Sequence, residues 1–172
     1  MDDQHGKTIA WLAGMIDADG SIGLHKQPYK CRVHYVPSIT LVTSCKRTTE
    51  YLQTVFANLF VGVNITERHP KNEGWNIVWV FAVRGMKRCE KLLSIISDCL
   101  ITKSDEATML TEFIASRKRH TKRAAYTSEE LAFVEAIKQR KHNRNLRGRM
   151  LNAQASDVMA QSLGKPSEDT DS

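Results

Sequence analysis

Small residues recur at every fourth position of an apolar segment near the start of the chain. Ala10, Gly14 and Ala18 lie four apart, and the apolar residues around them follow a helical period that predicts a helix over residues 8–18. This spacing puts the three small residues on one ridge of the helix. A ridge with almost no side chain lets a second helix approach until the two backbones nearly touch. The segment therefore predicts a helix that packs closely against another.

Two acids, Asp17 and Asp19, stand at the C-terminal end of this expected helix, and Gly20 ends it. Negative charge is unfavourable there because of the helix macrodipole, and a bound cation would offset the cost. Carboxylate and carbonyl oxygens are the ligands that Mg²⁺ prefers. Two such helices on a two-fold axis would bring two Asp19 carboxylates together. The alternative is a buried helix ending in a turn, with both acids bonded to local amides.

The remaining hydrophobic patterns predict an α+β domain. Strands are expected over residues 21–26, 32–43, 61–68 and 75–84. Pro28 is expected to end the first strand, and residues 69–74 connect the last two. Helices are expected over residues 49–60, 86–100 and 104–117. A capping box that begins at Thr127 predicts one more helix, with a core stripe of Leu131, Val134 and Ile137. No segment occurs twice in the chain.

Basic residues are concentrated in the C-terminal third. The 172-residue chain carries 25 Lys and Arg against 19 Asp and Glu, and eleven of the basic residues lie between Arg117 and Arg149. Such a block suits a polyanion, although it could equally be a solvated helical face. We therefore expect a core domain over residues 1–117, a basic helical extension over 118–151, and a polar, disordered tail over 152–172.

Composition also limits the compartment. No apolar run approaches the roughly 18–20 residues of a membrane span, so no membrane partner is expected. The N-terminal residues lack the layout of a secretory signal, and the four cysteines show no CxxC spacing. These features predict an intracellular, reducing compartment without a zinc site or disulfides. An organellar, bacterial, archaeal or viral origin is left open.

The segment from Leu12 to Ser21 resembles the signature of the LAGLIDADG homing endonucleases. Eight of the nine motif letters match, and Met15 is a conservative change for Leu. The αββαββα order is also similar to the core of that family, over about residues 8 to 115. The resemblance implies a saddle of antiparallel strands that straddles DNA, with extra C-terminal helices and with two motif helices at the centre of the interface.

The resemblance also implies catalytic roles. Asp19, with the Ala18 carbonyl, would bind Mg²⁺ and position the attacking water, whereas Asp17 would be structural. Mn²⁺ would substitute for Mg²⁺, and Ca²⁺ would support binding without cleavage. Lys103 matches a lysine that offsets phosphate charge or lowers the pKa of a metal-bound water, unless it is an ordinary surface lysine. The family's Gln or Asn after the second strand is missing here, and Ser44 is the candidate in its place.

The polar side of the strands supplies the expected contacts to double-stranded DNA. The candidate residues are His25, Gln27, Arg32, His34, Ser38, Thr40, Arg68 and His69. Arginine and glutamine can read base edges with two hydrogen bonds, and contacts to phosphates are expected to outnumber contacts to bases. Any single member of this set could instead be merely solvated.

One motif supplies one Asp19, whereas cutting two strands needs two, so the resemblance implies a homodimer with Ala10, Gly14 and Ala18 at its interface. The leading hypothesis is a site-specific, metal-dependent DNA endonuclease. It would make double-strand breaks with short 3′ overhangs at a long pseudo-palindromic target, as in intron or intein homing. One alternative is an RNA-binding cofactor of intron splicing (a maturase). A second is a DNA-binding regulator without cleavage, against which the presence of Asp19 argues.

Overall fold

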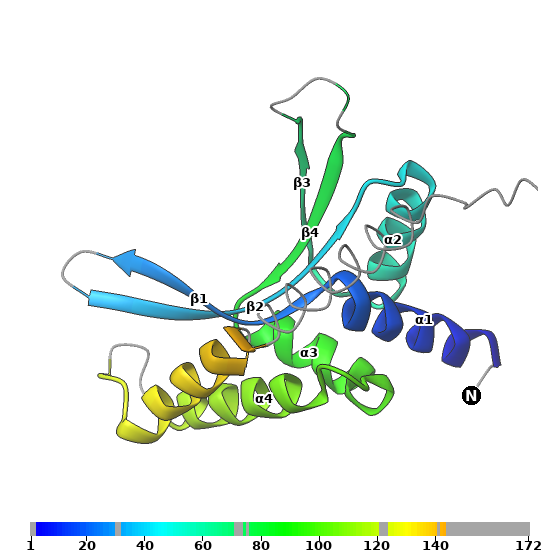
Figure 1. The fold of residues 1–172 in the computed structure, drawn as a ribbon. Coiled ribbons are helices and arrows are strands. Elements are labelled where there is room, and N and C mark those ends of the chain that lie inside the picture. Colours follow the sequence, from blue (N-terminus) through cyan, green and yellow to red (C-terminus); the bar gives the residue numbers. More distant parts are fainter. Residues whose placement is uncertain are drawn as a thin grey trace, which may run out of the picture. The chain divides into compact units, whose positions relative to one another are not determined.

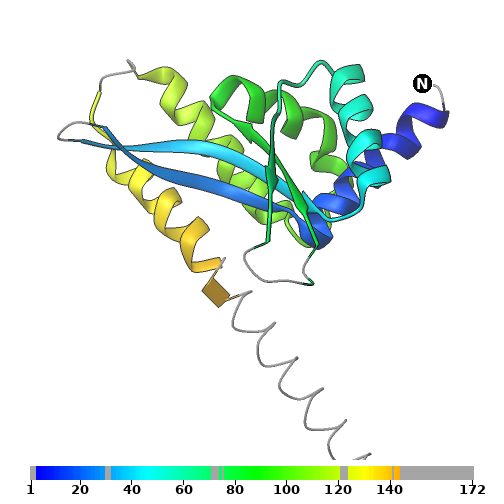
Figure 2. The same cartoon turned by 90° about the horizontal axis from the view of Figure 1, so that it is seen from above.

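The structure is a computed structural model that describes residues 3–29, 32–70, 74, 76–120, 124–140 and 142–143. It contains a four-stranded antiparallel sheet in the order β1-β2-β4-β3, with helices on one of its faces (Figures 1 and 2). The elements in chain order are α1 (Asp3–Asp19), β1 (Ser21–Tyr29), β2 (Arg32–Thr43), α2 (Lys46–Asn58), β3 (Asn64–Arg68), β4 (Val78–Arg84), α3 (Met86–Ile96), the 3₁₀ helix η1 (Ser97–Cys99) and α4 (Ser104–Arg119). The predicted αββαββα order and fold class are confirmed.

The described residues up to Ile137 form one compact unit. Residues 128–137 of this unit are helical, and residues 138–140 and 142–143 beyond it are helical as well. None of the helices in the described ranges is long and apolar enough to cross a membrane. The tail expected over 152–172 and the centre of the β3–β4 connection (71–73) lie outside the described residues.

β1 continues through Pro28, which was expected to end it. Pro28 pairs with Val33 on β2, and β1 lies at the edge of the sheet. Proline is tolerated in an edge strand, because there its missing N–H is not needed for a ladder hydrogen bond. The prediction that Pro28 breaks this strand is therefore wrong, and the β1–β2 ribbon reaches Tyr29.

The core lies between the sheet and the helices. α1, α2 and α3 contact β2, and α4 contacts β1. Alternate strand residues point into this layer, as the alternating pattern of 32–43 predicted. The largest fully buried side chains are Leu12, Ile16, Ile22, Leu41, Leu52, Phe81, Leu92, Leu93, Ile96, Leu110, Phe113 and Ile114. The helices of the described unit leave the other face of the sheet uncovered (Figure 2).

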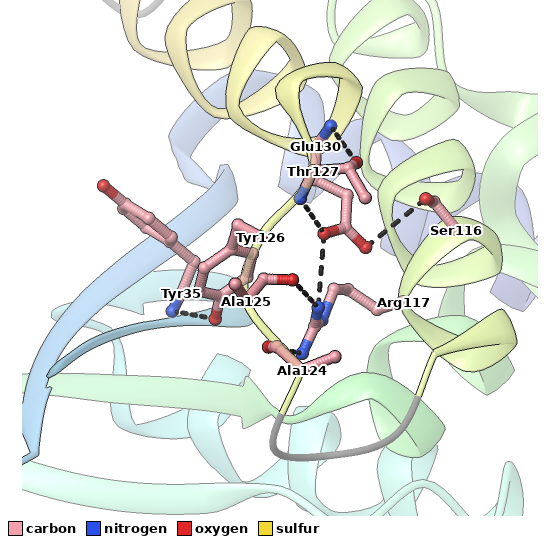
Figure 3. Close-up of polar contacts among 8 residues, drawn as sticks. All are labelled: Tyr35, Ser116, Arg117, Ala124, Ala125, Tyr126, Thr127 and Glu130. Atoms are coloured by element: carbon pink, nitrogen blue, oxygen red, sulfur yellow. Dashed lines mark hydrogen bonds and ion pairs between the residues drawn. The ribbon is translucent and has the colours of Figure 1, made fainter.

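A buried polar network joins residues 124–130 to α4 (Figure 3). The Glu130 side chain is fully buried, and its carboxylate accepts hydrogen bonds from Arg117 Nη1 at 3.2 Å and from the backbone N–H of Thr127 at 2.9 Å. The backbone N–H of Glu130 donates in turn to Thr127 Oγ1 at 3.2 Å. The predicted capping box at Thr127 is thus confirmed.

The core stripe of this helix differs from the prediction at one position. Val134 and Ile137 are buried, but Leu131 is 46% exposed. The buried face begins at Glu130, which precedes Val134 by four residues and Ile137 by seven. Glu130 can occupy a core position because Arg117 and the capping-box donor satisfy its carboxylate. A pattern that counts only apolar residues therefore starts the stripe one residue too late.

Replacing Glu130 by alanine is expected to lower the free energy of unfolding by about 3–5 kcal/mol, because it leaves the Arg117 guanidinium, whose side chain is 9% exposed, without its counter-charge. Urea denaturation followed by circular dichroism measures the change. Glu129→Ala at the exposed neighbouring position is the control and should stay within about 0.5 kcal/mol of the unchanged protein. Equal losses in the two variants would contradict the role given to the network.

Candidate functional site

Asp17 is held by the segment that leads into α4. Its Oδ2 accepts hydrogen bonds from the backbone N–H groups of Ile101 at 2.6 Å and Thr102 at 3.3 Å. Its Oδ1 accepts from the backbone N–H of Lys103 at 3.0 Å and from the Thr102 hydroxyl at 3.1 Å. Partial burial raises the pKa of Asp17, but these hydrogen bonds outweigh it, and the pKa lies below its ordinary value. Asp17 therefore ties the end of α1 to the start of α4.

This bonding makes the stability contributed by Asp17 sensitive to acid. The pKa of Asp17 is lower in the folded chain than its ordinary value of 3.8, so the contribution is complete well above pH 3.8 and is lost as the pH falls through the folded value. We expect Asp17→Asn to lower the free energy of unfolding at neutral pH, and this difference to shrink in acid. Urea denaturation at a series of pH values measures it, with Asp98→Asn at an exposed position as the control. A difference that does not change with pH would contradict the assignment.

Lys103 is buried at the same end of α1, with 3% of the residue exposed. Its Nζ donates hydrogen bonds to the carbonyl oxygen of Ile16 at 2.8 Å and to that of Asp17. A cation is favourable at this end of a helix, where the macrodipole is negative. Lys103 is therefore not an ordinary surface lysine, and its charge lies where the sequence places the reaction. Its catalytic role stays a prediction.

Asp19 contrasts with Asp17. It is exposed, and in the described part of the chain its carboxylate has no hydrogen bond or ion pair. The carbonyl oxygen of Ala18 is likewise without a donor there, whereas those of Ile16 and Asp17 are taken by Lys103. Within the described residues, the end of α1 thus presents the unpaired carboxylate of Asp19 and the unpaired carbonyl of Ala18.

Gly20 fixes where these oxygens lie. A Cβ atom at Gly20 would be 2.6 Å from the carbonyl oxygen of Ile16, which is closer than any real contact of this kind. Only glycine lets the chain pass from α1 into β1 over a single residue, from Asp19 to Ser21. The short connection keeps Asp19 at the junction of helix and sheet.

These oxygens fit part of a magnesium site. The described residues contain no group of three or more His, Cys, Asp or Glu side chains that could hold a metal ion. Mg²⁺ in phosphate-transfer sites commonly takes one or two carboxylates and completes its shell with water and phosphate oxygens. Asp19 and Ala18 suit that mode of binding, provided that the remaining ligands come from a substrate, water or a second copy of the chain.

The small-residue ridge lies on the exposed side of α1. Ala10, Gly14 and Ala18 are exposed, whereas Leu12 and Ile16 on the other side are fully buried. A Cβ atom added at Gly14 would meet nothing within 4 Å. In a single chain, therefore, no packing within the described residues explains why position 14 is glycine.

Ser44 is exposed at the junction of β2 and α2. Ser21, the first residue of β1, pairs with Thr40, so the chain before β1 and the chain after β2 leave the ribbon at the same end. Asp19 and Ser44 therefore both lie beyond this end. The next residue, Cys45, is also exposed, and hydrogen bonds, chiefly to Thr48, lower the pKa of its thiol. In the sequence, the only sign of this is that a cysteine stands just before a helix.

The strand register orients the candidate DNA contacts. Residues that pair directly across an antiparallel ladder share a face of the sheet. Thr40 pairs with Ser21 and Ala82, whereas its neighbours Ile39 and Leu41 point into the core. The same reasoning, applied to every pair of the sheet, places seven of the eight candidates on the open face. They are His25, Gln27, Arg32, His34, Ser38, Thr40 and Arg68.

His69 is the exception. Its Nε2 lies 3.2 Å from the Glu67 carboxylate, and Glu67 points to the opposite face from its neighbour Arg68. The structure thus does not bring His69 to the open face. Arg84, by contrast, is exposed and pairs with Ser38 on that face. Arg84 could not be recognised from the sequence because both sides of its strand are apolar, so only its pairing with Ser38 reveals which way it points.

Several solved structures that share this fold are homing endonucleases. I-CvuI in complex with a DNA target aligns over 78% of this chain and 96% of its own, with 18% identity and a TM-score of 0.55. I-TnaI aligns over 75% of this chain and 84% of its own, with 16% identity and a TM-score of 0.55. I-SmaMI bound to DNA aligns over 76% of this chain but 43% of its own, with 16% identity and a TM-score of 0.56.

Residues 7–97 match the model of one family, described as the LAGLIDADG-like domain. The chain therefore belongs to the LAGLIDADG family. Comparison with curated proteins gives no match. The relative I-CvuI has been solved with DNA in the presence of 2 mM Mg and, separately, of 2 mM Ca.

Proposed function

We propose that this chain is a site-specific, divalent-metal-dependent DNA endonuclease that acts as a homodimer. The observation that carries the proposal is the contrast between two acids at the end of α1. Asp17 is bonded by the segment before α4, whereas Asp19 is exposed and has no partner in the described ranges. A carboxylate left unpaired at the negative end of a helix costs stability, and a bound cation would offset that cost.

The residues around Asp19 have separate tasks in this proposal. Asp17 and Lys103 hold the end of α1, so the Asp19 carboxylate and the Ala18 carbonyl are in position before DNA binds. A bound Mg²⁺ would supply charge stabilisation at the scissile phosphate and activation of the attacking water. The Lys103 ammonium group would offset negative charge that develops on the phosphate, and the Ser44 hydroxyl would help to order water.

Two copies are needed because one chain supplies one Asp19. The ridge of Ala10, Gly14 and Ala18 is exposed and lets two α1 helices meet closely enough to bring both carboxylates to one pair of scissile phosphates. This chain covers 96% of I-CvuI but 43% of I-SmaMI, as expected if two copies do the work of one longer chain. A two-fold dimer would read a pseudo-palindromic target.

The open sheet face, rather than the basic block, is the DNA surface in this proposal. Arg117 is paired with buried Glu130, and Lys118 lies 2.5 Å from the Glu90 carboxylate, so both charges are used within the chain. Six further members of the block lie outside the described residues: Lys122, Arg123, Lys141, Arg144, Arg147 and Arg149. The division into a core, a basic extension and a tail stays a proposal.

Arg84→Gln is expected to weaken binding to the DNA target and to flatten its dependence on salt. Each lost phosphate contact should reduce the slope of log K against log[salt] by about 0.9, and a dimer loses two. Fluorescence anisotropy at several salt concentrations measures the slope. Lys26→Gln is the matched control, because Lys26 is exposed on the same sheet but pairs with Tyr35 on the opposite face. Equal effects of the two changes would show that the open face is not the DNA surface.

Cleavage at the insertion site of the gene tests the proposal as a whole. The substrate is a plasmid in which the two DNA segments that flank the insertion are joined directly. The insertion is the coding sequence, or the intron or intein that contains it. Incubation with the purified chain and Mg²⁺ should give a linear product with short 3′ overhangs, and EDTA should prevent cutting. A plasmid with the insertion intact is the control. If the joined plasmid stays uncut and a filter-binding assay shows that the chain binds intron RNA specifically, the splicing-cofactor alternative is favoured instead.

A further inference from the structure

Phe60 occupies a backbone conformation that normally requires glycine. α2 ends in a Schellman motif, in which the N–H of Val61 donates to the Phe56 carbonyl at 3.1 Å and that of Phe60 to the Ala57 carbonyl at 3.0 Å. This motif sets φ of Phe60 to 52°, the one positive φ of a non-glycine residue in the described ranges. The Phe60 side chain is 82% exposed, so burial of the ring does not offset the strain. Retained strain of this kind points to a function.

Two cations of α3 flank this turn. Lys91 Nζ donates to the Phe60 carbonyl at 2.9 Å and lies 5.6 Å from the centre of its ring. The Arg88 guanidinium lies against Gly62, where an added Cβ would be 3.0 Å from Arg88 Nε. We refer to Phe60, Arg88 and Lys91 as the Phe60 cluster.

The charge of the Phe60 cluster is not neutralised within the described part of the chain. Neither Arg88 nor Lys91 has a carboxylate partner there, and the same is true of exposed Lys87. Glu90, the one acid among these residues of α3, is already paired with Lys118. An exposed aromatic ring thus stands beside two cations, Arg88 and Lys91, that have no carboxylate partner in the described residues.

The Phe60 cluster is separate from the open face of the sheet. α3 packs against β2 and β4 on the covered face, and Figure 1 shows it on the helix side of the sheet. Arg88 and Lys91 are exposed on α3. DNA bound on the open face would therefore leave the Phe60 cluster accessible.

We propose that the Phe60 cluster is a second nucleic-acid site, which binds a single-stranded segment. An unpaired base would stack on the Phe60 ring while Arg88 and Lys91 hold the adjacent phosphates. A duplex is a poor ligand for such a ring, because its bases are already stacked on one another. A protein partner is disfavoured, since it would meet one isolated ring surrounded by positive charge rather than an apolar patch. Single-stranded RNA and single-stranded DNA share this chemistry, and RNA is the ligand that a role in splicing would need.

Phe60→Gly separates binding from folding. Glycine suits the left-handed turn, so the melting temperature should rise by roughly 2–4 °C. Loss of the stacking ring should at the same time weaken binding of the full chain to labelled oligouridylate and oligothymidylate by about 5- to 150-fold in fluorescence anisotropy. Affinity for the duplex target should not change. A more stable variant that binds single strands less well cannot be explained by misfolding.

Matched variants complete the test. Arg88→Gln and Lys91→Gln should each lower the salt dependence of single-strand binding. Arg84→Gln should have the opposite effect to Phe60→Gly: it should weaken binding to the duplex target and leave binding to single strands unchanged. Leu131→Ala removes an exposed apolar side chain elsewhere, so it should leave both affinities unchanged. The oligonucleotide that binds more tightly, oligouridylate or oligothymidylate, identifies RNA or DNA as the ligand. Unchanged single-strand affinity in Phe60→Gly, or displacement of single strands by the duplex target, would overturn the proposal.

Discussion

Asp19→Asn is expected to reduce cleavage of the DNA target in Mg²⁺ by about 10³-fold or more, while binding to the target in Ca²⁺ persists. Asparagine keeps the size and nearly the shape of the side chain but removes the anion that would hold the metal. The loss occurs twice in a dimer. Because Asp19 makes no bond in the described part of the chain, the change should leave folding nearly intact. Binding should be unchanged or tighter, since two negative charges near phosphates are gone.

A gel of the cut plasmid and a binding titration in Ca²⁺ measure the two effects on the same preparation. Asp17→Asn is the matched control, because it makes the same chemical change two residues earlier in α1. Its carboxylate accepts four hydrogen bonds from residues 101–103, so its loss should appear mainly in the free energy of unfolding. If Asp19→Asn still cuts at nearly the original rate, the assignment of the metal ligand is wrong.

Gly14→Leu is expected to stabilise the single chain and to abolish the dimer. In one chain a Cβ at position 14 meets nothing within 4 Å, and glycine inside a helix costs about 0.8–1.0 kcal/mol relative to alanine. Between two α1 helices, by contrast, the leucine would force the backbones apart. An overpacking cost of about 1–3 kcal/mol on each chain gives roughly 2–6 kcal/mol, which weakens the dimer at least about 30-fold. Cleavage should fail with it.

Sedimentation at several protein concentrations, without DNA and with it, measures the assembly. Gly14→Ala should be intermediate, because one methyl group moves the helices less. Gln53→Leu adds the same side chain at an exposed position of α2 and should leave both assembly and cleavage unchanged. A Gly14→Leu protein that cuts as a monomer would contradict the interface.

The order of the elements and the motif could be predicted because both depend on neighbours in sequence. Helical spacing around Gly14, alternation along Arg32–Thr43 and the capping box at Thr127 are local patterns, and the structure contains each of them. Leu131 shows the limit of such patterns, because the position buried in its place is taken by an acid, Glu130.

Other features depend on partners far away in the chain. Pro28 lies inside β1 because that strand is at the edge of the sheet, a fact that no local pattern contains. Arg84 is oriented by its pairing with Ser38, more than forty residues earlier. The strain at Phe60 follows from the way α2 ends, and the charges beside it come from α3. Sequence patterns could propose the residues of the site, but not their surroundings.

The bonds at the end of α1 have a consequence for when activity can begin during synthesis. Asp17 and the carbonyl of Ile16 are bound by residues 84 to 87 positions later in the chain. The motif helix leaves the ribosome early, but these bonds cannot form until residues 101–103 have followed. An incomplete chain that already carries the whole motif would therefore lack the ordered pair of oxygens at Ala18 and Asp19. If the chain is a nuclease as proposed, a fragment that ends before residues 101–103 should therefore be inert.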